Sequence, residues 1–379
     1  MPIEFRILHE NSSGVRAGEL ITPHSKILTP MFMPVGTAGA LKAMTTDQLL
    51  EIGAPIMLSN AYHLSLKPGS RIIEKLGGLH RFMNWPKSLL TDSGGYQVYS
   101  LPHKKISDEG VIFKNQTTGE EIHFTPEYSI QTQNEIGADI IMAFDQCDSF
   151  PVDYQTAKHS LKRTLSWAER SLKAHKNPKQ ALFGISQGSI YKDLREIGIK
   201  NLSQMDFQGY ALGGLSVGEG REKMKEVLEL CKDLLPKEKP RYVMGIGMPE
   251  DIFLAVENGI DLFDCIIPTK YARAGVLFTY GGRVKIKSPK YKTDKYPIDT
   301  QLYSYTAKNY SRAYLHHLFQ ANEILGATLA SIHNVHFFIH LVQNIRQSIL
   351  DGKFEEYKTN FFRFYSKTDS KVEILGKED

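Results

Sequence analysis

Eight short apolar runs, many of them separated by helix-like segments, constrain the fold of this chain more than any other feature of its sequence. The runs are MFMPV at residue 31, IMLS at 56, SLLT at 88, DIIMAF at 139, LFGIS at 182, YALGG at 210, YVMGI at 242 and DLFD at 261. Helix start signals follow several of them, at Thr46, at Thr125-Pro126-Glu127, at Gly220 and at Pro249-Glu250-Asp251. Eight strand–helix units predict an α/β fold of the TIM-barrel type.

Length and composition agree with such a fold. A chain of 379 residues with 41% apolar content can bury a large core, as one barrel-sized domain or as two smaller ones. No run reaches the roughly 18 apolar residues of a membrane span, and the start of the chain lacks the order of a secretory signal, so we expect a cytoplasmic protein. Cys147, Cys231 and Cys265 form no CxxC pair, which argues against a disulfide framework or a zinc knot and favours reduced thiols.

Polar residues follow the apolar runs at the positions where barrel strands should end. Asp92 follows the third run, Asp145 the fourth, Gln187 the fifth and Asp264 the eighth. Buried strand ends ordinarily carry apolar side chains, and active sites of these barrels lie at the carboxyl ends of the strands. The pattern therefore predicts one polar site at that end of the barrel.

The segment LLTDSGGYQV, residues 89 to 98, contains the first of these acids. Gly94 and Gly95 allow the backbone to approach a ligand closely, and Tyr96 offers a flat face on which a planar ring can stack. An ordinary strand-to-helix turn is the alternative interpretation of Asp-Ser-Gly-Gly.

Two carboxylates at one barrel mouth indicate chemistry at a glycosidic bond. One of Asp92 and Asp264 would act as the nucleophile on an anomeric carbon while the other moves protons. Asp145 is better suited to hydrogen bonding, because a carboxylate can accept from an amine and a ring N–H of a purine together.

Six basic residues against one acid, Asp294, mark the segment from residue 283 to 295. They are Arg283, Lys285, Lys287, Lys290, Lys292 and Lys295. Their alternation in RVKIK predicts a strand with one basic face, which suits RNA phosphates. A solvated strand edge protected by lysines is the alternative.

Seven motifs in a fixed order resemble those of the bacterial tRNA-guanine transglycosylases. They are TDSGGYQV, FDQC, GISQG, GYALGGLSVGE, YVMGIGMPEDI, GIDLFDCIIPT and NYSRAYLHHL, and the resemblance extends from about residue 5 to 350. It implies an irregular TIM barrel as a single domain over residues 1–379, with a basic and helical subdomain over 283–350, and a homodimer. It also implies exchange of guanine at wobble position 34 of GUN-anticodon tRNAs for a 7-deazaguanine, without ATP or a redox cofactor.

The resemblance further assigns roles to individual positions. Asp264 would be the nucleophile that attacks C1′ of the ribose, and Asp92 the general acid and base. The base-binding residues it implies are Asp92, Ser93, Gly94, Gly95, Tyr96, Asp145, Gln187, Gly214, Leu215 and Met244. The RNA-binding residues it implies are Gly245, Ile246, Gly247, Met248, Pro249, Glu250, Asp251, Thr269, Lys270, Tyr271, Ala272 and Arg273, together with Lys285 and Lys287 of the basic segment.

The usual zinc site of this family is the main departure. Its three cysteines are replaced by Leu302, Ser304 and Ala307, and only His333 remains. One imidazole cannot hold a structural zinc, which takes four donors, so we expect no metal. We expect apolar packing in its place, with Tyr303, Tyr305 and Tyr310 as fillers. A metal site rebuilt from the nearby histidines His316, His317, His336 and His340 is the alternative.

The incoming base is open between preQ1 and queuine, with preQ1 favoured. Ser216 is similar to the members that insert queuine, whereas Val217 and Cys147 are bacterial in type. Lys270, Tyr271, Ala274 and Ser189 also depart from the usual residues of the family. Two other functions stay open: a catalytically silent tRNA-binding partner, which should have lost Asp92 or Asp264, and a glycoside hydrolase, which should have more tryptophans than Trp85 and Trp167.

Overall fold

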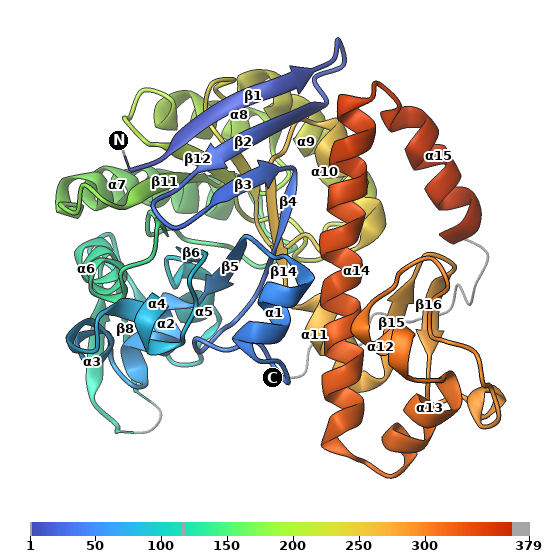
Figure 1. The fold of residues 1–379 in the computed structure, drawn as a ribbon. Coiled ribbons are helices and arrows are strands. Elements are labelled where there is room, and N and C mark those ends of the chain that lie inside the picture. The colour runs from blue at the N-terminus through green and yellow to red at the C-terminus, as the bar shows by residue number, and fades with distance from the viewer. Residues whose placement is uncertain (1, 116–117, 366–379) are drawn as a thin grey trace. The chain divides into compact units, whose positions relative to one another are not determined.

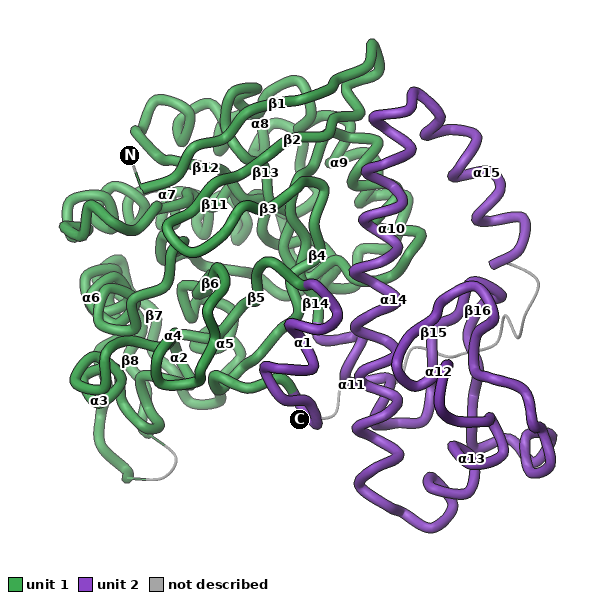
Figure 2. Tube along the Cα trace, viewed as in Figure 1, with its two compact units in different colours: residues 1–41, 54–265 green, residues 42–53, 266–379 purple. Residues whose placement is uncertain are grey.

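The computed structural model describes residues 2–115 and 118–365. The chain forms two compact units, Met1–Leu41 with Ala54–Cys265, and Lys42–Gly53 with Ile266–Asp379 (Figure 2).

Eight parallel strands in the first unit form a closed barrel (Figure 1). They are β4 (Met31–Pro34), β5 (Ile56–Ser59), β6 (Ser88–Thr91), β10 (Ile140–Met142), β11 (Ala181–Ser186), β12 (Gly209–Leu212), β13 (Arg241–Val243) and β14 (Leu262–Cys265). Their order is β4-β14-β13-β12-β11-β10-β6-β5, and a bridge between Val35 and Leu58 joins the two ends. The Gly36 N–H donates to the Leu58 carbonyl at 2.7 Å across the same seam. All eight predicted strands are confirmed, and so is the TIM-type barrel.

Helices follow most of these strands, as the start signals predict. They are α2 (Ala61–Leu66), α3 (Ser70–Lys75), α4 (Gly78–Phe82), α5 (Gly95–Ser100), α6 (Pro126–Ile136), α7 (Tyr154–Ala174), α8 (Lys192–Leu202), α9 (Arg221–Leu234) and α10 (Pro249–Glu257). Thr125 caps α6 by accepting a hydrogen bond from the Tyr128 N–H, and Gly220 precedes α9. Trp85 and Trp167 are both buried, so neither lines a sugar cleft.

Two small antiparallel sheets were not predicted. The first consists of β1 (Glu4–Glu10), β2 (Arg16–Ile21) and β3 (Lys26–Thr29), and the second of β7 (Lys105–Ile106), β8 (Val111–Lys114) and β9 (Glu121–Phe124). In the first sheet, the turn after β2 reaches the start of β6, where Thr22 Oγ1 lies 2.7 Å from Ser88 Oγ. This sheet therefore lies at the amino-terminal end of the barrel strands.

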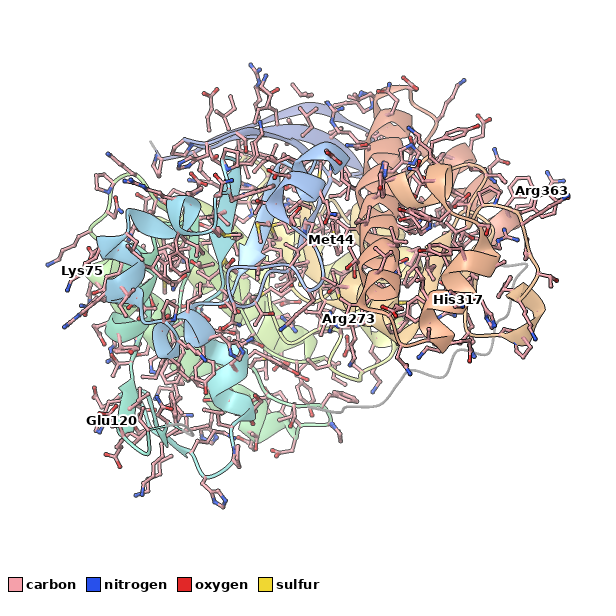
Figure 3. The ribbon with its side chains drawn as sticks, turned by 60° about the horizontal axis from the view of Figure 1, so that its bottom comes forward. Met44, Lys75, Glu120, Arg273, His317 and Arg363 are labelled. Carbon is pink, nitrogen blue, oxygen red and sulfur yellow. The ribbon has the colours of Figure 1, made fainter. Side chains whose placement is uncertain are left out.

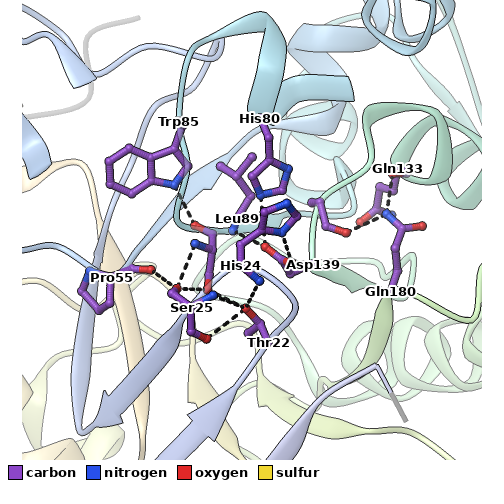
Figure 4. Close-up of polar contacts among 12 residues, drawn as sticks. Thr22, His24, Ser25, Pro55, His80, Trp85, Leu89, Gln133, Asp139 and Gln180 are labelled. Atoms are coloured by element: carbon purple, nitrogen blue, oxygen red, sulfur yellow. Dashed lines mark hydrogen bonds and ion pairs between the residues drawn. The ribbon is translucent and has the colours of Figure 1, made fainter. Parts of the chain in front are cut away.

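A buried carboxylate, Asp139, fastens the same turn to the barrel (Figure 4). His24 Nδ1 lies 2.6 Å from its Oδ1 and His80 Nε2 lies 3.2 Å from its Oδ2. The Leu89 N–H donates to Oδ2 at 2.9 Å. We call His24, His80 and Asp139 the histidine clasp.

The second unit is mainly helical. It contains α1 (Thr46–Ile52), α11 (Ile267–Ala274), β15 (Val276–Thr279), β16 (Gly282–Lys285), η1 (Pro289–Tyr291), α12 (Tyr305–Asn309), α13 (Arg312–Gln320), α14 (Ile324–Leu350) and α15 (Phe354–Tyr365). Among the described residues, α14 is the one helix whose length and composition would allow it to cross a membrane, and 67% of its most apolar stretch is buried inside the protein. Core helices of globular proteins share this composition.

Candidate active site

The four polar residues predicted at strand ends lie at the carboxyl end of the barrel. Asp92 directly follows β6, Asp145 lies three residues past β10, Gln187 directly follows β11, and Asp264 lies within β14. The three aspartates are close enough to interact, since the negative charges of Asp264 and Asp145 both contribute to the raised pKa of Asp92.

Two donors hold one oxygen of the Asp264 carboxylate. Tyr242 Oη donates to Oδ1 at 2.5 Å, and the Gly245 N–H donates to the same oxygen at 3.0 Å. Tyr242 comes from the neighbouring strand β13 and is fully buried; its burial and the Asp264 charge raise its pKa, so it stays a donor. Burial raises the pKa of Asp264, and these two hydrogen bonds oppose that rise. Neither donor binds Oδ2, which leaves that oxygen for a ligand.

Asp92 is held differently. Asn60 Nδ2 donates to its Oδ2 at 2.5 Å and the Ala61 N–H to its Oδ1 at 2.9 Å. Burial, with the nearby Asp264 charge, raises the pKa of Asp92 to about 7. A carboxyl with this pKa can both give and take a proton near neutral pH.

Asp145, Gln187 and Ser93 form a buried hydrogen-bonded network. Gln187 Nε2 donates to Asp145 Oδ2 at 2.7 Å, and Ser93 Oγ donates to Oδ1 at 3.0 Å. Burial raises the pKa of Asp145 to about 6. A Cβ at Gly95 would lie 2.5 Å from Asp145 Oδ1, so only glycine fits beside this network.

Glycine is also required on the other side of the network. A Cβ at Gly214 would lie 2.5 Å from Gln187 Oε1, and the residue has a φ of +64°. Of the remaining predicted base-binding residues, Leu215 is buried, Met244 half-buried and Tyr96 57% exposed. The ring of Tyr96 is thus accessible for stacking.

The predicted RNA-binding residues fall in both units. In the first, Gly245 binds Asp264, whereas Ile246, Gly247 and Pro249 are buried and could meet RNA only through their backbone. Met248, Glu250 and Asp251 are half-buried, and Asp251 pairs with Arg221 at 2.6 Å.

In the second unit, Thr269, Tyr271 and Ala272 of α11 are buried, Lys270 is half-buried and Arg273 is exposed (Figure 3). From Val284 to Lys287 buried and exposed residues alternate: Val284 and Ile286 are buried, Lys285 and Lys287 exposed. The predicted one-sided basic strand is thus confirmed for β16, which ends at Lys285, and the alternation continues to Lys287.

Three site residues were not identified from the sequence: Tyr242, Asn60 and Arg195. Arg195 is fully buried, and its guanidinium donates to the carbonyls of Ser186 at 3.0 Å and Gly214 at 3.4 Å, so it ties two pocket loops together. Tyr242 lies in the predicted strand run YVMGI, two positions before Met244, but this spacing alone does not distinguish it from a core tyrosine.

Leu302, Ser304, Ala307 and His333, at the positions that match the family's usual zinc site, do not fit a structural zinc. Ser304 Oγ lies 2.8 Å from His333 Nδ1, and His333 Nε2 lies 2.7 Å from the Phe278 carbonyl, so both ring nitrogens are engaged. Leu302 and Ala307 are buried and offer no donor. Tyr310 packs against this core, whereas the predicted role of Tyr303 and Tyr305 as fillers is wrong, because they are 71% and 50% exposed.

The histidine clasp is the one group among the described residues that brings three ligand atoms within 4.8 Å of one another. Its imidazole rings are stacked, with centroids 3.7 Å apart and planes 16° from parallel. Lone pairs lie in the ring planes, so such rings do not converge on an ion at about 2.1 Å. The three hydrogen bonds to Asp139 account for the arrangement.

A barrel with one carboxylate held by two donors and a second carboxyl of pKa about 7 at the ends of its strands has the groups that a glycosyl-transferring enzyme needs. The family model described as queuine tRNA-ribosyltransferase matches residues 11–367. The chain therefore belongs to this family.

Similar proteins cover nearly the whole chain. A queuine tRNA-ribosyltransferase of Thermoanaerobacter sp. is 51% identical over 366 residues, which are 96% of this chain and 98% of that protein. One of Pediococcus pentosaceus is 48% identical over 97% of this chain and 98% of its own length, and one of Enterococcus faecalis is 47% identical over 96% of each.

Proposed function

We propose that this protein exchanges the guanine at position 34 of GUN-anticodon tRNAs for a 7-deazaguanine, with preQ1 rather than queuine as the incoming base. A contrast between the two carboxyls carries the proposal. Both donors to Asp264 bind Oδ1, whereas each oxygen of Asp92 accepts a hydrogen bond and the pKa of Asp92 is about 7. This contrast supplies one carboxylate for attack and one for proton transfer.

In the first half-reaction, Asp264 Oδ2 attacks C1′ of the ribose as the bond from C1′ to N9 of guanine breaks. Asp92 gives its proton to the departing base, which leaves neutral, and the ribose stays bound to Asp264 through a C1′–O bond. In the second, Asp92 takes the N9 proton of the incoming base. N9 then attacks C1′, the C1′–O bond breaks, and both carboxyls return to their starting states.

Asp145 and Gln187 would select the base that enters the pocket. Asp145 presents acceptor oxygens, and Gln187 can rotate away from it to meet a base edge. The target guanine must leave the anticodon stack to reach this depth, as enzymes that act on a base require. Tyr96 and Met244 would cover its two faces.

The exchange breaks and forms the same type of bond, so we propose that it needs neither ATP nor a redox cofactor. We also propose that the chain carries no structural zinc, that it acts in the cytoplasm and that it forms a homodimer.

A row of aromatic rings in the second unit supports the dimer: Tyr305–Tyr310, Tyr310–Tyr314 and Tyr314–His317 have centroids 6.1, 5.4 and 6.4 Å apart, and Tyr305 is 50% exposed. Native mass spectrometry of Tyr305→Ala, at the exposed end of this row, tests it: we expect a larger share of monomer than in the wild type, and an unchanged dimer would contradict the role of this surface.

The decisive experiment incubates the protein with unmodified GUN-anticodon tRNA and radiolabelled guanine, then adds preQ1 or queuine as competitor. We expect label in the tRNA, and faster displacement by preQ1. Asp264→Ala should abolish incorporation and the RNA-linked band on a denaturing gel, whereas Asp206→Asn, in a loop outside the pocket, should not. Tight tRNA binding without any incorporation would favour the silent partner instead.

A further inference from the structure

A groove of about 540 Å³ lies on the second small sheet, between the end of α5 and strands β7 and β8. Its apolar lining includes Leu101, Ile112 and Phe113, and its basic lining His103, Lys105 and Lys114. The basic side chains are exposed, Leu101 and Ile112 are half-buried, and Phe113 is buried. The groove thus has an apolar base and a cationic rim, and none of these residues belongs to the base pocket.

The chain path places this groove at the same end of the barrel as the pocket. The sheet is inserted between α5, which starts at the carboxyl end of β6, and α6, which leads back to the start of β10. Helix α5 runs from Gly95 to Ser100, which is about 9 Å at 1.5 Å per residue. Tyr96 at its start belongs to the pocket, and Leu101 just after its end belongs to the groove.

Buried packing joins the groove to the residues beside two pocket carboxylates. Phe113 lies in one apolar cluster with Tyr62 and Phe144. Tyr62 directly follows Ala61, whose N–H binds Asp92, and Phe144 directly precedes Asp145. The groove and the residues next to these carboxylates therefore share one apolar core.

The charges around the groove favour an anionic occupant. The nearby acids Asp108 and Glu109 pair with Arg163 at 3.0 Å and Arg170 at 3.6 Å. Glu121 is the one acid among the lining residues; it stands opposite Lys114 in the pairing of β8 with β9, and its carboxylate lies 2.9 Å from His123 Nε2. Two lysines and His103 therefore face one acid in the groove. Lys105 and Lys114 thus face solvent beside an apolar surface, which is the combination that single-stranded RNA binds, with the base on the apolar part and the phosphate on the cations.

We propose that this groove binds an anticodon-loop nucleotide that flanks the exchanged guanine. This inference rests on the proposed function and extends it, because it adds a point of RNA contact outside both the residues that hold the base and the predicted RNA-binding residues 245–251, 269–273, Lys285 and Lys287. When the target base leaves the stack, its neighbours lose a stacking partner, and a nearby site that holds one of them would stabilise the open loop.

The test compares Lys105→Ala/Lys114→Ala with Lys158→Ala/Lys162→Ala, which removes the same charge from exposed positions on α7. For the groove variant we expect tRNA affinity to fall roughly three- to tenfold and the slope of log K against log salt to fall by about 1 to 2. KM for guanine and kcat at saturating tRNA should stay unchanged, and Lys105→Arg/Lys114→Arg should bind as the wild type does. Equal melting temperatures show that the variants fold.

Crosslinking identifies the contact directly. With 4-thiouridine placed in turn at each anticodon-loop position, at least one position next to the target should crosslink to residues 101–114. Unchanged tRNA affinity and salt slope, crosslinks that all lie elsewhere, or weakened self-association in place of weakened tRNA binding would each overturn the proposal. Absence of guanine exchange by the wild type would instead contradict the proposed function, since these binding measurements do not require turnover.

Discussion

At the residue scale, Asp92 and Asp264 show how two identical side chains acquire different chemistry. Burial raises the pKa of both, but Tyr242 and Gly245 donate to a single oxygen of Asp264 and oppose the rise, whereas the pKa of Asp92 reaches about 7. Hydrogen bonds to the charged form favour that form. The two donors therefore favour the ionised form of Asp264, which the proposed attack requires, and Asp92 can carry a proton near neutral pH.

Tyr242→Phe tests the role of the donor. Loss of a hydrogen bond to a charged group costs about 1.5–3 kcal/mol, so we expect kcat to fall roughly ten- to hundredfold while KM for guanine stays the same. Without this donor the pKa of Asp264 should rise further, and the acid limb of the kcat profile should move to higher pH. Tyr210→Phe on β12 is the matched control, because its hydroxyl donates to the Met205 carbonyl. If the acid limb of the kcat profile of Tyr242→Phe stays at the pH of the wild type, Tyr242 does not set the pKa of Asp264.

If Asp92 acts as the acid in one half-reaction and as the base in the other, the two half-reactions should have opposite pH dependences. Guanine departure needs protonated Asp92, so formation of the RNA-linked species should slow as pH rises through about 7. Attack by the incoming base needs ionised Asp92, so discharge of that species should slow as pH falls. The midpoint should lie below 7, because Asp264 is esterified in that species and its charge no longer helps to raise the pKa of Asp92. Single-turnover gels resolve the two steps. Asp92→Asn should slow both by about 10² to 10⁴ and remove both dependences; half-reactions with the same pH trend would contradict the assignment.

Asp92, Asp145, Gln187 and Asp264 could be predicted from the sequence because the barrel pattern fixes where its strands end, and packing alone rarely places polar side chains there. Tyr242 could not be separated from core tyrosines, since its partner is 22 residues away in sequence and only strand pairing brings the two together.

At the element scale, the turn between β2 and β3 is held to the barrel by the histidine clasp. Burial alone would raise the pKa of Asp139, but hydrogen bonds from His80, His24 and the Leu89 N–H hold it below its ordinary value. The contribution to stability is therefore present above the unfolded-state pKa of about 3.9 and is lost as pH falls through the lower folded-state value.

Asp139→Asn should reduce the free energy of unfolding at pH 7 by about 1–3 kcal/mol, because a buried acceptor of three hydrogen bonds is weakened. Urea titrations should show this difference shrinking as pH falls below about 4. Glu121→Gln, in the exposed pair with His123, is the control and should change stability by less than about 0.5 kcal/mol. A difference that persists unchanged to the lowest pH would argue against the clasp.

The barrel strands were predictable and the two small sheets were not, for a physical reason. Parallel strands buried on both faces are near-continuous apolar runs, as in IMLS and SLLT. Strand β1 is exposed at every second residue and carries Glu, Arg and His, so its sequence lacks such a run. Its position depends on pairing with β2 rather than on its own composition.

At the scale of the whole molecule, the pocket residues and the residues at the family's usual zinc positions lie in different units. The pocket residues, from Asn60 to Asp264, belong to the first unit, and residues 302–333 belong to the second. The pocket can therefore be kept whether or not residues 302–333 hold a metal. In that region a hydrogen-bonded chain runs from Ser304 through His333 to the Phe278 carbonyl. Burial lowers the pKa of His333, which keeps its ring neutral in that chain.

Introducing the three cysteines that the family usually has at these positions tests whether the base pocket is independent of this region. Leu302→Cys/Ser304→Cys/Ala307→Cys would supply three thiolates to join His333 Nδ1, while Nε2 keeps its bond to the Phe278 carbonyl, the usual second partner of a metal-binding imidazole. We expect metal analysis to find one equivalent of zinc per chain, and none in the wild type or in the triple variant that also carries His333→Gln. KM for guanine should be the same in all three, because the base pocket lies in the other unit. Stoichiometric zinc in the wild type would show that other donors hold it, and a triple variant without zinc would show that the four positions no longer converge.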